Sequence, residues 1–598
     1  MNALILLLAG LGLFVLGYRF YSAFIAAKVL VLDETRKTPS YELYNGHDFV
    51  PTNKYVLFGH HFAAIAGAGP LIGPVLAAQF GFLPGAIWII FGSVLAGAVH
   101  DMVILFASVR HNGEALHSLA FRFMGRVSSI TTAIATLFIM ITALSGLGIA
   151  VVNSMSESAW GTFTIAFTIP VALFVGWYMR FFRPEKIGEG SFIGVTLVIF
   201  GVIAGNWVAQ SSIASWFLFS KHQISVLLAI YGFFASVLPV WLLLAPRDYL
   251  SSYMKIGTIF LLAIGIFITS PHIHMPALTK YVAGGGPVIP GTLWPYVCIT
   301  IACGAISGFH SLISSGTTPK MVKNEKDIRF IGYGAMIMEG FVALMALIAA
   351  TVLKPADYFA INVPKDIFQN LGLVPENIEA LSKMVGEDVL GRTGGAVSLA
   401  VGMAYIFSSI PGLKGLMSYW YHFAIMFEAL FILTTIDAGT RVGRYILQES
   451  LGAIYKPFKR FNWIPGVLIT STLITFSWGY LLYFGTVSTI WPMFGVSNQL
   501  LAVIALCIGT TFILKTSSKK IYALITFIPF LFMFSVTFTA GILNIFKIYL
   551  PAGTVHSRIN MVLTAIMLIL VLIISIDGMR NWINVLFKKR GQLYFLRE

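Results

Sequence analysis

The sequence predicts an all-α protein that crosses a membrane many times, and three observations support this prediction. Hydrophobic residues make up 58% of the 598 residues and charged residues only 11%, against roughly 25% in soluble domains. The mean hydropathy is +0.85, so most of the protein surface is expected to face lipid. The apolar residues form long unbroken runs, whereas a transmembrane β-barrel would show alternating segments of about ten residues.

Sixteen apolar runs approach the roughly 20 residues that a helix needs to span the hydrocarbon core. We therefore predict a polytopic helix bundle of about 15–16 spans. The runs lie near Ala3–Ala26, His61–Gln79, Pro84–Ser108, Ser128–Val152, Trp160–Phe181, Gly190–Val208, Ile224–Leu244, Met254–Thr269, Gly291–Ile313, Ile331–Leu353, Ala396–Ile410, Leu416–Ile436, Ile464–Phe484, Ile490–Leu514, Tyr522–Ile542 and Met561–Ile576.

Loop charges predict the orientation, because cytoplasmic loops carry an excess of Lys and Arg. Basic loops alternate with nearly uncharged ones, which places the N-terminus outside and the basic C-terminal tail inside a cell inner (cytoplasmic) membrane. The first apolar run has no basic residue before Arg19, so we expect a retained span and no cleaved leader. The basic loops are Lys28–Lys54, Arg110–Arg126, Arg180–Lys186, Arg247–Lys255 and Lys320–Arg329.

Two later segments complete this topology. The connection 354–393 is rich in acidic residues, falls outside and is expected to form a small folded cap. The alternation then fails, because two full spans at 396–410 and 416–436 would put the basic segment Arg441–Arg460 outside. Pro411 follows the shorter of the two runs. We therefore predict that one of them crosses fully and that the other is re-entrant or half-length.

Two helices are predicted to be interrupted within the membrane. The first is 61–74 (HFAAIAGAGPLIGP), which holds two prolines and three glycines, residues that stop or weaken a helix. The second is 235–248 (ASVLPVWLLLAPRD). Five predicted spans lie from the first break up to the second, so the second helix enters from the opposite side. Opposed, discontinuous helices indicate a five-plus-five inverted-repeat transporter; alternatively, the prolines only kink helices for packing.

This reading divides the chain into four parts. An extra N-terminal span and a cytoplasmic loop occupy 1–60. The two inverted repeats occupy 61–222 and 223–438, and the second includes the external loop 354–393. Accessory spans and the basic tail occupy 439–598.

The interrupted helices supply the predicted substrate site. The N-terminus of a half-helix directs backbone N–H groups and a positive dipole end at an anion. The polar stretch 307–318 follows the same logic, because hydroxyls near unwound carbonyls can hold an ion or a polar solute. The predicted substrate-binding residues are Gly67, Ala68, Gly69, Pro70, Gly73, Leu238, Pro239 and His310.

A second set is predicted to couple transport to protons or to an ion, since polar and ionisable groups at membrane depth are costly and usually functional. Each member has an ordinary alternative. Asp101 could lie at a helix end, His61 at the membrane interface and Glu339 against a buried partner, and the hydroxyls could join helices by hydrogen bonds. The set is Asp101, Ser314, Ser315, Thr317, Glu339 and His61.

Several classes of protein are excluded or disfavoured. The net charge of +15 lies mostly in loops, which disfavours nucleic-acid binding. No P-loop motif is present, and no HExxH or GxSxG motif suggests an enzyme. Cys298, Cys303 and Cys507 lie in apolar segments without metal-ligand spacing. We predict no cofactor and no metal; the expected partners are a small-molecule substrate, protons or sodium and the lipid bilayer, with the oligomeric state open.

Five stretches resemble the carbon starvation protein A (CstA) family. They are Asn45–Gly81 (NGHDFVPTNKYVLFGHHFAAIAGAGPLIGPVLAAQFG), Val237–Ser251 (VLPVWLLLAPRDYLS), Ser307–Lys320 (SGFHSLISSGTTPK), Ile331–Ala350 and Trp491–Ala502 (WPMFGVSNQLLA). The likeness extends over most of the chain. Where the family has the string AVQD, this chain has His100 before Asp101.

The resemblance implies an inner-membrane importer of pyruvate or short peptides that is induced in carbon starvation, a stress response, and is coupled to protons. It also implies kinship with the transporter superfamily of five-plus-five inverted repeats, the amino-acid/polyamine/organocation type. In that superfamily the first broken helix and the eighth core helix flank a cation site, which corresponds here to 66–71, Ser314, Ser315 and Thr317. The alternatives are a sodium-coupled carrier of another organic solute and a membrane sensor without transport.

Overall fold

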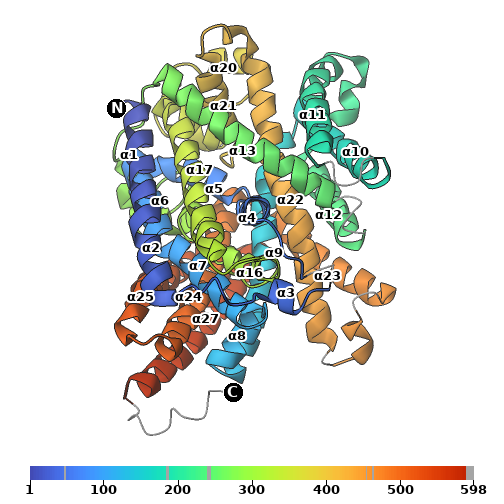
Figure 1. The fold of residues 1–598 in the computed structure, drawn as a ribbon. Coiled ribbons are helices and arrows are strands. Elements are labelled where there is room, and N and C mark those ends of the chain that lie inside the picture. The colour runs from blue at the N-terminus through green and yellow to red at the C-terminus, as the bar shows by residue number, and fades with distance from the viewer. Residues whose placement is uncertain (46–48, 183–186, 239–243, 453, 461–462, 588–598) are drawn as a thin grey trace.

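The computed structural model describes residues 1–598 except 46–48, 183–186, 239–243, 453, 461–462 and 588–598. The described residues form helices and contain no β-strand; two isolated bridges join Asn2 to His272 and Thr52 to Val322. The architecture is an all-α bundle, as the composition predicts. Figure 1 shows the helices in chain order.

The first half of the chain supplies fourteen of the helices. They are α1 Ala3–Leu16, α2 Ser22–Phe24, α3 Pro39–Glu42, α4 Lys54–Ile65, α5 Gly69–Ala77, α6 Phe82–Gly92, α7 Ala98–Arg110, α8 Leu116–Phe123, α9 Arg126–Met155, α10 Ala159–Phe181, α11 Ile187–Ala209, α12 Lys221–Val237, α13 Leu244–Thr269 and α14 Leu293–Thr300. Short π-helical turns join α1 to α2 and α6 to α7, so each pair forms one continuous rod.

The second half supplies the other thirteen helices. They are α15 Ala302–Ala305, α16 Phe309–Ser314, α17 Gly334–Thr351, α18 Pro355–Asn362, α19 Lys365–Gln369, α20 Ile378–Val385, α21 Ala396–Ser408, α22 Met417–Gly452, α23 Ile464–Phe484, α24 Val487–Thr516, α25 Leu524–Leu543, α26 Leu550–Ala552 and α27 Val555–Phe587.

The number of helices long and apolar enough to cross a membrane is lower than the sequence suggested. Eleven such helices occur among the described residues, or twelve if the bent pair α4 and α5 forms one span. The predicted count of 15–16 is therefore not confirmed. The remaining four runs coincide with shorter or interrupted helices: α12, the apolar part of α13, the segment α14–α16, and α21.

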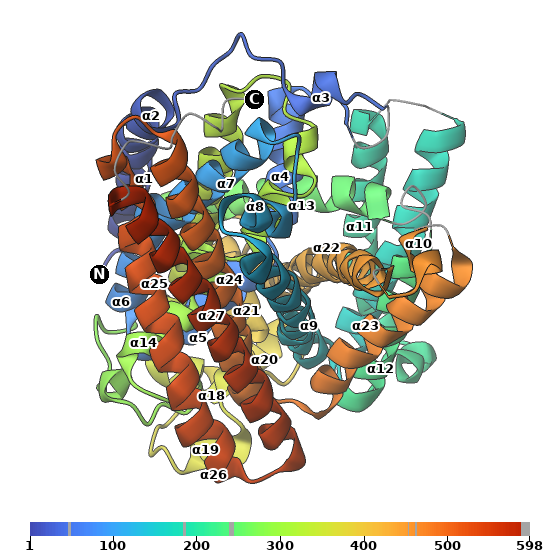
Figure 2. The same ribbon diagram turned by 90° about the horizontal axis from the view of Figure 1, so that it is seen from below.

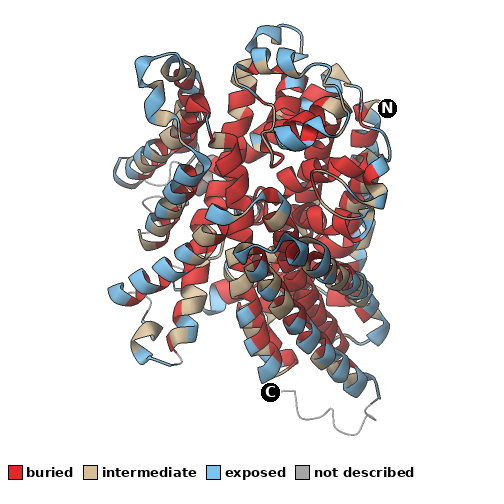
Figure 3. Ribbon diagram, turned by 180° about the vertical axis from the view of Figure 1, so that it is seen from behind, coloured by how far each residue is buried: buried red, intermediate tan, exposed pale blue. Residues whose placement is uncertain are grey.

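The bundle has a buried centre and apolar flanks. Figure 3 shows buried residues throughout the middle and exposed ones along the outer helices. Helices α24, α25 and α27 pack together on one flank, and α10 and α11 form a hairpin on another (Figure 2). Large apolar side chains lie exposed on these flanks: Phe192 of α11 is 76% exposed and Ile569 of α27 57%. Such surfaces are stable against lipid and costly against water.

The acidic connection folds as a cap of three short helices, α18, α19 and α20, which agrees with the prediction for 354–393. The next two helices also agree in length with the expected pair of one partial and one full span. Helix α21 has 13 residues, whereas the helical stretch Lys414–Gly452 has 39. Helix α20 contacts α22, so the cap covers the start of the long helix.

Two basic segments that the sequence suggested as loops are helical and buried, which corrects the loop assignment. Arg247 and Lys255 lie within α13 and are 0% and 1% exposed. Arg441 lies within α22 and is 9% exposed. The prediction failed because loop charge and buried charge look alike in a sequence until the partners are known.

Candidate functional site

The structure shows the first predicted break. Helix α4 ends at Ile65 because Ala66 leaves the helical region (φ −76°, ψ 80°), and α5 begins at Gly69 with Pro70 in its first turn. Proline is tolerated there because the first N–H groups of a helix have no intrahelical partner. The half-helices meet at a bend of 48°. The break therefore leaves the carbonyls that end α4 and the N–H groups that begin α5 without helical partners.

A second interrupted segment, α14–α16, lies against this break. Ile301 (φ −95°, ψ 52°) ends α14, and Ile306 is extended (φ −156°, ψ 121°) before α16 begins at Phe309. Asn498 of α24 stabilises the opening: its Oδ1 accepts from the Phe309 N–H at 3.0 Å and from Ser307 Oγ at 3.1 Å, and its carbonyl accepts from Gly308 N at 3.1 Å. Unwound backbone inside a bundle needs such partners.

The two interrupted segments run antiparallel. His61 of α4 bonds to Thr318, which follows the end of α16. Further along, Gly69 lies against Cys303 and Gly73 against Thr300. The residue numbers rise along one segment and fall along the other, so the segments cross the bundle in opposite directions.

Glycine permits the close approach of the segments. A Cβ atom on Gly69 would lie 2.3 Å from Cys303 Sγ, and one on Gly73 would lie 2.4 Å from the Thr300 carbonyl oxygen. A Cβ on Gly67 would lie 2.9 Å from Thr435 Oγ1 of α22. The three glycines predicted at the site thus bring α4–α5 into direct contact with α14, α15 and α22.

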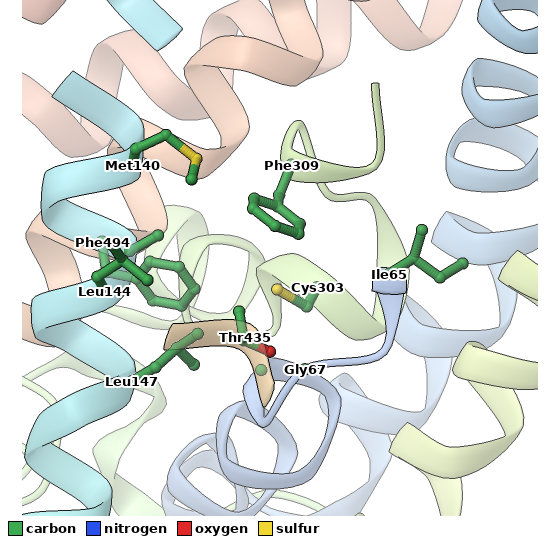
Figure 4. A pocket seen from close by; sticks show the side chains of 11 residues that line it. Ile65, Gly67, Met140, Leu144, Leu147, Cys303, Phe309, Thr435 and Phe494 are labelled. Atoms are coloured by element: carbon green, nitrogen blue, oxygen red, sulfur yellow. The ribbon is translucent and has the colours of Figure 1, made fainter. Parts of the chain in front are cut away.

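A cavity of about 20 Å³ lies at the break (Figure 4). This volume is sufficient for about one water molecule. A pyruvate-sized solute would need a wider state of the protein. The walls come from α4, α5, α9, α15, α16, α22 and α24, and they are Ile65, Gly67, Gly69, Met140, Ala143, Leu144, Leu147, Cys303, Phe309, Thr435 and Phe494.

A larger cavity of about 250 Å³ lies elsewhere, between the end of α23, the start of α24, and α26–α27. Its walls include Tyr480, Phe484 and His556. None of the predicted site residues lines it. We place the candidate site at the smaller cavity because the unwound backbone lines it and the buried charged groups lie beside that backbone.

A cluster of three fully buried ionisable side chains lies beside the break. His310 of α16 stands between two carboxylates: its Nδ1 is 2.8 Å from Asp101 Oδ2 of α7, and its Nε2 is 2.9 Å from Glu339 Oε2 of α17. All three side chains are 0% exposed. Phe309, the neighbour of His310 in sequence, lines the cavity.

The cluster can hold two or three protons. With two protons, either both on the imidazole or one on His310 and one on a carboxyl, the net charge of the three side chains is −1. A third proton makes an imidazolium, one carboxylate and one carboxylic acid, with a net charge of zero. Because a net charge is expensive in a buried site, proton gain or loss here changes the cost of burying the cluster.

Two further histidines extend this cluster. His100 Nδ1 lies 2.6 Å from Asp101 Oδ1, so Asp101 is held from both sides. His61 of α4 bonds through Nδ1 to Thr318 Oγ1 at 2.7 Å and lies within electrostatic range of Asp101 and His310. No group of three or more His, Cys, Asp or Glu side chains in the described part of the chain is placed to hold a metal ion.

Lys255 of α13 binds the carbonyl end of the break. Its Nζ donates to the Ala63 carbonyl at 3.0 Å and to the Ala66 carbonyl at 2.9 Å, and it lies 4.2 Å from the Phe431 ring centroid. The ammonium also acts through space on Glu339. A protein cation thus occupies the carbonyl end of α4, where the helix dipole favours positive charge.

The other predicted residues lie around this site in different ways. Ser315 Oγ bonds to the Ser311 carbonyl, and Ser314 is buried without a hydrogen-bond partner among the described residues. Thr317 is exposed, and its neighbour Thr318 makes the contact to His61. Leu238 follows the last residue of α12; its carbonyl accepts from Arg441, and it does not line the cavity. Pro239 and 240–243 lie outside the described residues, so the predicted second interruption at 235–248 stays a prediction; on its two sides α12 ends at Val237 and α13 begins at Leu244.

Sequence reasoning missed three contributors to the site. Lys255 was counted with loop charges, and Thr435 carried no distinguishing pattern within α22. Asn498 sits in the string WPMFGVSNQLLA, a stretch that carries the family resemblance but had no assigned role. The one signal in the sequence is a polar amide within an apolar run, which could have marked Asn498 as a partner for unwound backbone elsewhere in the bundle.

Comparison with known proteins gives one family. A family model described as carbon starvation protein CstA matches residues 2–540. The peptide transporter CstA of Bacillus subtilis (strain 168) is 47% identical over 583 residues, 97% of each chain. The pyruvate/proton symporter BtsT of Escherichia coli (strain K12) is 45% identical over 591 residues, 91% of this chain and 82% of the relative.

A solved manganese transporter of Eremococcus coleocola shares 13% identity with a TM-score of 0.47, covering 90% of this chain and 98% of that one. A likeness of this degree carries no argument about the site.

Proposed function

Because this chain belongs to the carbon starvation protein CstA family, we propose that it is a secondary active transporter that imports pyruvate or short peptides together with protons. Both solutes carry a carboxylate. The names of the relatives support this substrate class, since one is a peptide transporter and another a pyruvate/proton symporter. The buried cluster of Asp101, His310 and Glu339 is the observation that carries the coupling to protons.

The carboxylate of the solute would bind at the start of α5. The N–H of Gly69 opens this helix, where N–H groups lack intrahelical partners and the dipole favours an anion. Thr435 Oγ1 and the Gly67 backbone complete the polar part of the cavity wall. Met140, Leu144 and Phe494 form its apolar part. This combination suits a small anion with an organic body.

Protons are favoured over sodium by the position of Lys255. Unwound carbonyls are the groups that coordinate Na⁺ in transporters with broken helices. Here Lys255 Nζ already takes the Ala63 and Ala66 carbonyls at 3.0 and 2.9 Å. A sodium ion at the same carbonyls would have to displace a buried ammonium. The sodium-coupled carrier is therefore the second candidate.

Coupling follows from the protonation states of the cluster. Protonation of the cluster from outside neutralises it and permits the state that binds the solute. Release of that proton on the other side of the membrane restores the net charge of the cluster and favours return of the protein to its starting state. Because His310 lies on α16 and Asp101 and Glu339 on α7 and α17, the protonation state acts on the contact between an interrupted segment and the helices around it.

The finer architecture belongs to the same proposal. We take α4–α5 and α14–α16 as opposed discontinuous segments of an inverted repeat, supported by their antiparallel contact, whereas the sequence had suggested 235–248 as the partner of the first break. The sequence-based division at 61–222 and 223–438 places one segment in each repeat. The cap of α18–α20 and the N-terminus are proposed to lie outside and the C-terminus inside the cytoplasmic membrane, as the loop charges indicate.

Uptake by purified protein in proteoliposomes tests the function. An inward pH gradient should drive accumulation of pyruvate, alanyl-alanine or both, with no change when external sodium replaces potassium. Accumulation that follows a sodium gradient and ignores pH would support the second candidate. If folded protein showed neither uptake nor counterflow of either solute, the remaining candidate would be a membrane sensor without transport.

A further inference from the structure

One face of α22 connects the cap with the cavity. Tyr421, Glu428 and Thr435 recur every seven residues along this continuous helix. Seven residues are nearly two turns, so the three side chains lie on one face with a drift of only about 20° per step. Thr435 lines the cavity at the break. The same face therefore leads from the cavity toward the cap end of the helix.

Glu428 is the unusual member of this face. It is 1% exposed, and neither carboxyl oxygen has a hydrogen-bond partner among the described residues. No charged group in the described part of the chain acts on it. Because an isolated buried carboxylate is very costly, the group is held as a neutral carboxylic acid. A leucine or methionine would pack such a site at lower cost, so packing does not explain a carboxyl there.

Tyr421 links this carboxyl to the cap. Its hydroxyl is also buried without a hydrogen-bond partner among the described residues, and it lies within electrostatic range of both Glu428 and Glu387 of the cap. Glu387 in turn contacts His422 Nε2 at 3.2 Å and accepts from Ser158 Oγ. Polar groups thus succeed one another from the cap surface to the interior.

Charged groups on the neighbouring helices do not provide a partner for Glu428, because they are engaged elsewhere or stand at helix ends. On α13, Lys255 binds carbonyls and Arg247 lies 3.5 Å from Asp437. Those on the other neighbouring helices stand near helix ends: Arg126 of α9, Glu189 of α11, Lys221 of α12, and Glu379 and Lys383 of α20.

The spacing shows that the route is closed in this state. Seven residues of helix advance about 10 Å, while a proton moves directly only across a hydrogen bond of about 3 Å. One or two water molecules must enter on each side of Glu428 before it can exchange a proton. A buried carboxyl whose oxygens have no hydrogen-bond partner is the state expected of a proton-binding group while water reaches it from neither the cap side nor the cavity side.

We propose that Glu428 is a second proton-binding carboxyl, which carries protons between the cap end of the bundle and the cavity at the break. In the step, the O–H bond of the carboxylic acid breaks and its proton passes to a water molecule or to the solute carboxylate in the cavity. The carboxylate that remains takes a proton from water on the cap side. No electrons are exchanged. This inference rests on the proposed function.

The test compares net transport with exchange. Glu428→Gln keeps the shape and the neutral state of the side chain but cannot release a proton. In proteoliposomes we expect the accumulation driven by a pH gradient to be at least tenfold lower for Glu428→Gln than for wild type. Exchange of internal and external solute should stay within twofold of wild type. Glu428→Asp should restore part of the accumulation with a shifted pH profile, which a packing role would not require.

Matched controls lie nearby. Thr434→Ala is on the same helix but bonds only to its own backbone, at Leu430 and Phe431, and it should behave as wild type. Equal accumulation in wild type and Glu428→Gln would overturn the inference while leaving the proposed function intact. Wild-type uptake indifferent to the pH gradient would instead remove the proposed function. Loss of both exchange and accumulation in a folded Glu428→Gln protein would mean that Glu428 serves solute binding, which also contradicts this inference.

Discussion

Replacement of His310 by alanine perturbs the buried cluster most directly. The imidazole lies 2.8 Å from Asp101 and 2.9 Å from Glu339, and all three groups are fully buried. Its removal leaves two carboxyl groups facing an apolar space without a cation between them. Removing one partner of a buried pair costs about 3–5 kcal/mol, which is roughly 100-fold to 4,000-fold in a folding equilibrium.

The cost should be recoverable by neutralising the carboxyls. We expect His310→Ala to lower the thermal unfolding temperature of the purified protein. Addition of Asp101→Asn and Glu339→Gln should restore most of it, because the uncompensated charges are then gone. This recovery separates an electrostatic role of His310 from a packing role, in which the triple variant would stay as unstable as His310→Ala because Asn and Gln have nearly the volumes of Asp and Glu.

Transport gives the second half of the assay. A gradient of two pH units supports up to about 100-fold accumulation for each coupled proton. Wild type should use this gradient, whereas His310→Ala and the triple variant should only equilibrate the solute. Thr351→Ala, which removes a buried hydroxyl of α17 whose hydrogen bonds go to the Leu347 and Ile348 carbonyls of the same helix, is the control and should accumulate as wild type does. Proton-driven accumulation by the triple variant would refute the role given to the cluster.

Three further predictions concern the break and the cap. Lys255→Met leaves the Ala63 and Ala66 carbonyls without their donor, at about 1–3 kcal/mol each, so it should lower the unfolding temperature and abolish uptake; wild-type uptake in this variant would contradict the role of Lys255. Gly69→Ala places a Cβ 2.3 Å from Cys303 Sγ, an overpacking worth about 1–3 kcal/mol, and Cys303→Gly in the same chain should restore binding of solute measured by calorimetry; an unchanged single variant would disprove the close contact. Burial raises the pKa of Glu387 in the cap, so its neutral form favours the docked cap. The contribution is present at low pH and lost as pH rises through the raised pKa. Hydrogen exchange of 378–390, corrected for intrinsic rates, should therefore increase with pH in wild type but not in Glu387→Gln, and a pH-independent wild type would argue against it.

The sequence predicts the helical architecture and the first break for a simple physical reason. Proline and glycine act locally, so 61–74 could be identified as an interruption from its own residues. The break at 301–308 contains no proline, and its unwinding depends on Asn498 nearly two hundred residues later. A break stabilised by a distant side chain leaves no local pattern.

The charged residues of the site were found singly and their assembly was not. Asp101, His310 and Glu339 each stand out as ionisable groups in apolar runs, yet they come from α7, α16 and α17. His310 was assigned to the substrate, whereas it lies between the two carboxylates that were assigned to coupling. Lys255 was missed because a basic residue near a proline-rich segment resembles a cytoplasmic loop charge until its carbonyl partners are visible.

A structure of the protein with bound solute tests the central claim most directly. We expect density for pyruvate or a dipeptide between the start of α5 and Phe309, with the carboxylate at the Gly69 N–H and a cavity wider than about 20 Å³. Solute found in the cavity between α23, α24 and α27, with the break at Gly67–Gly69 still closed and empty, would contradict the account.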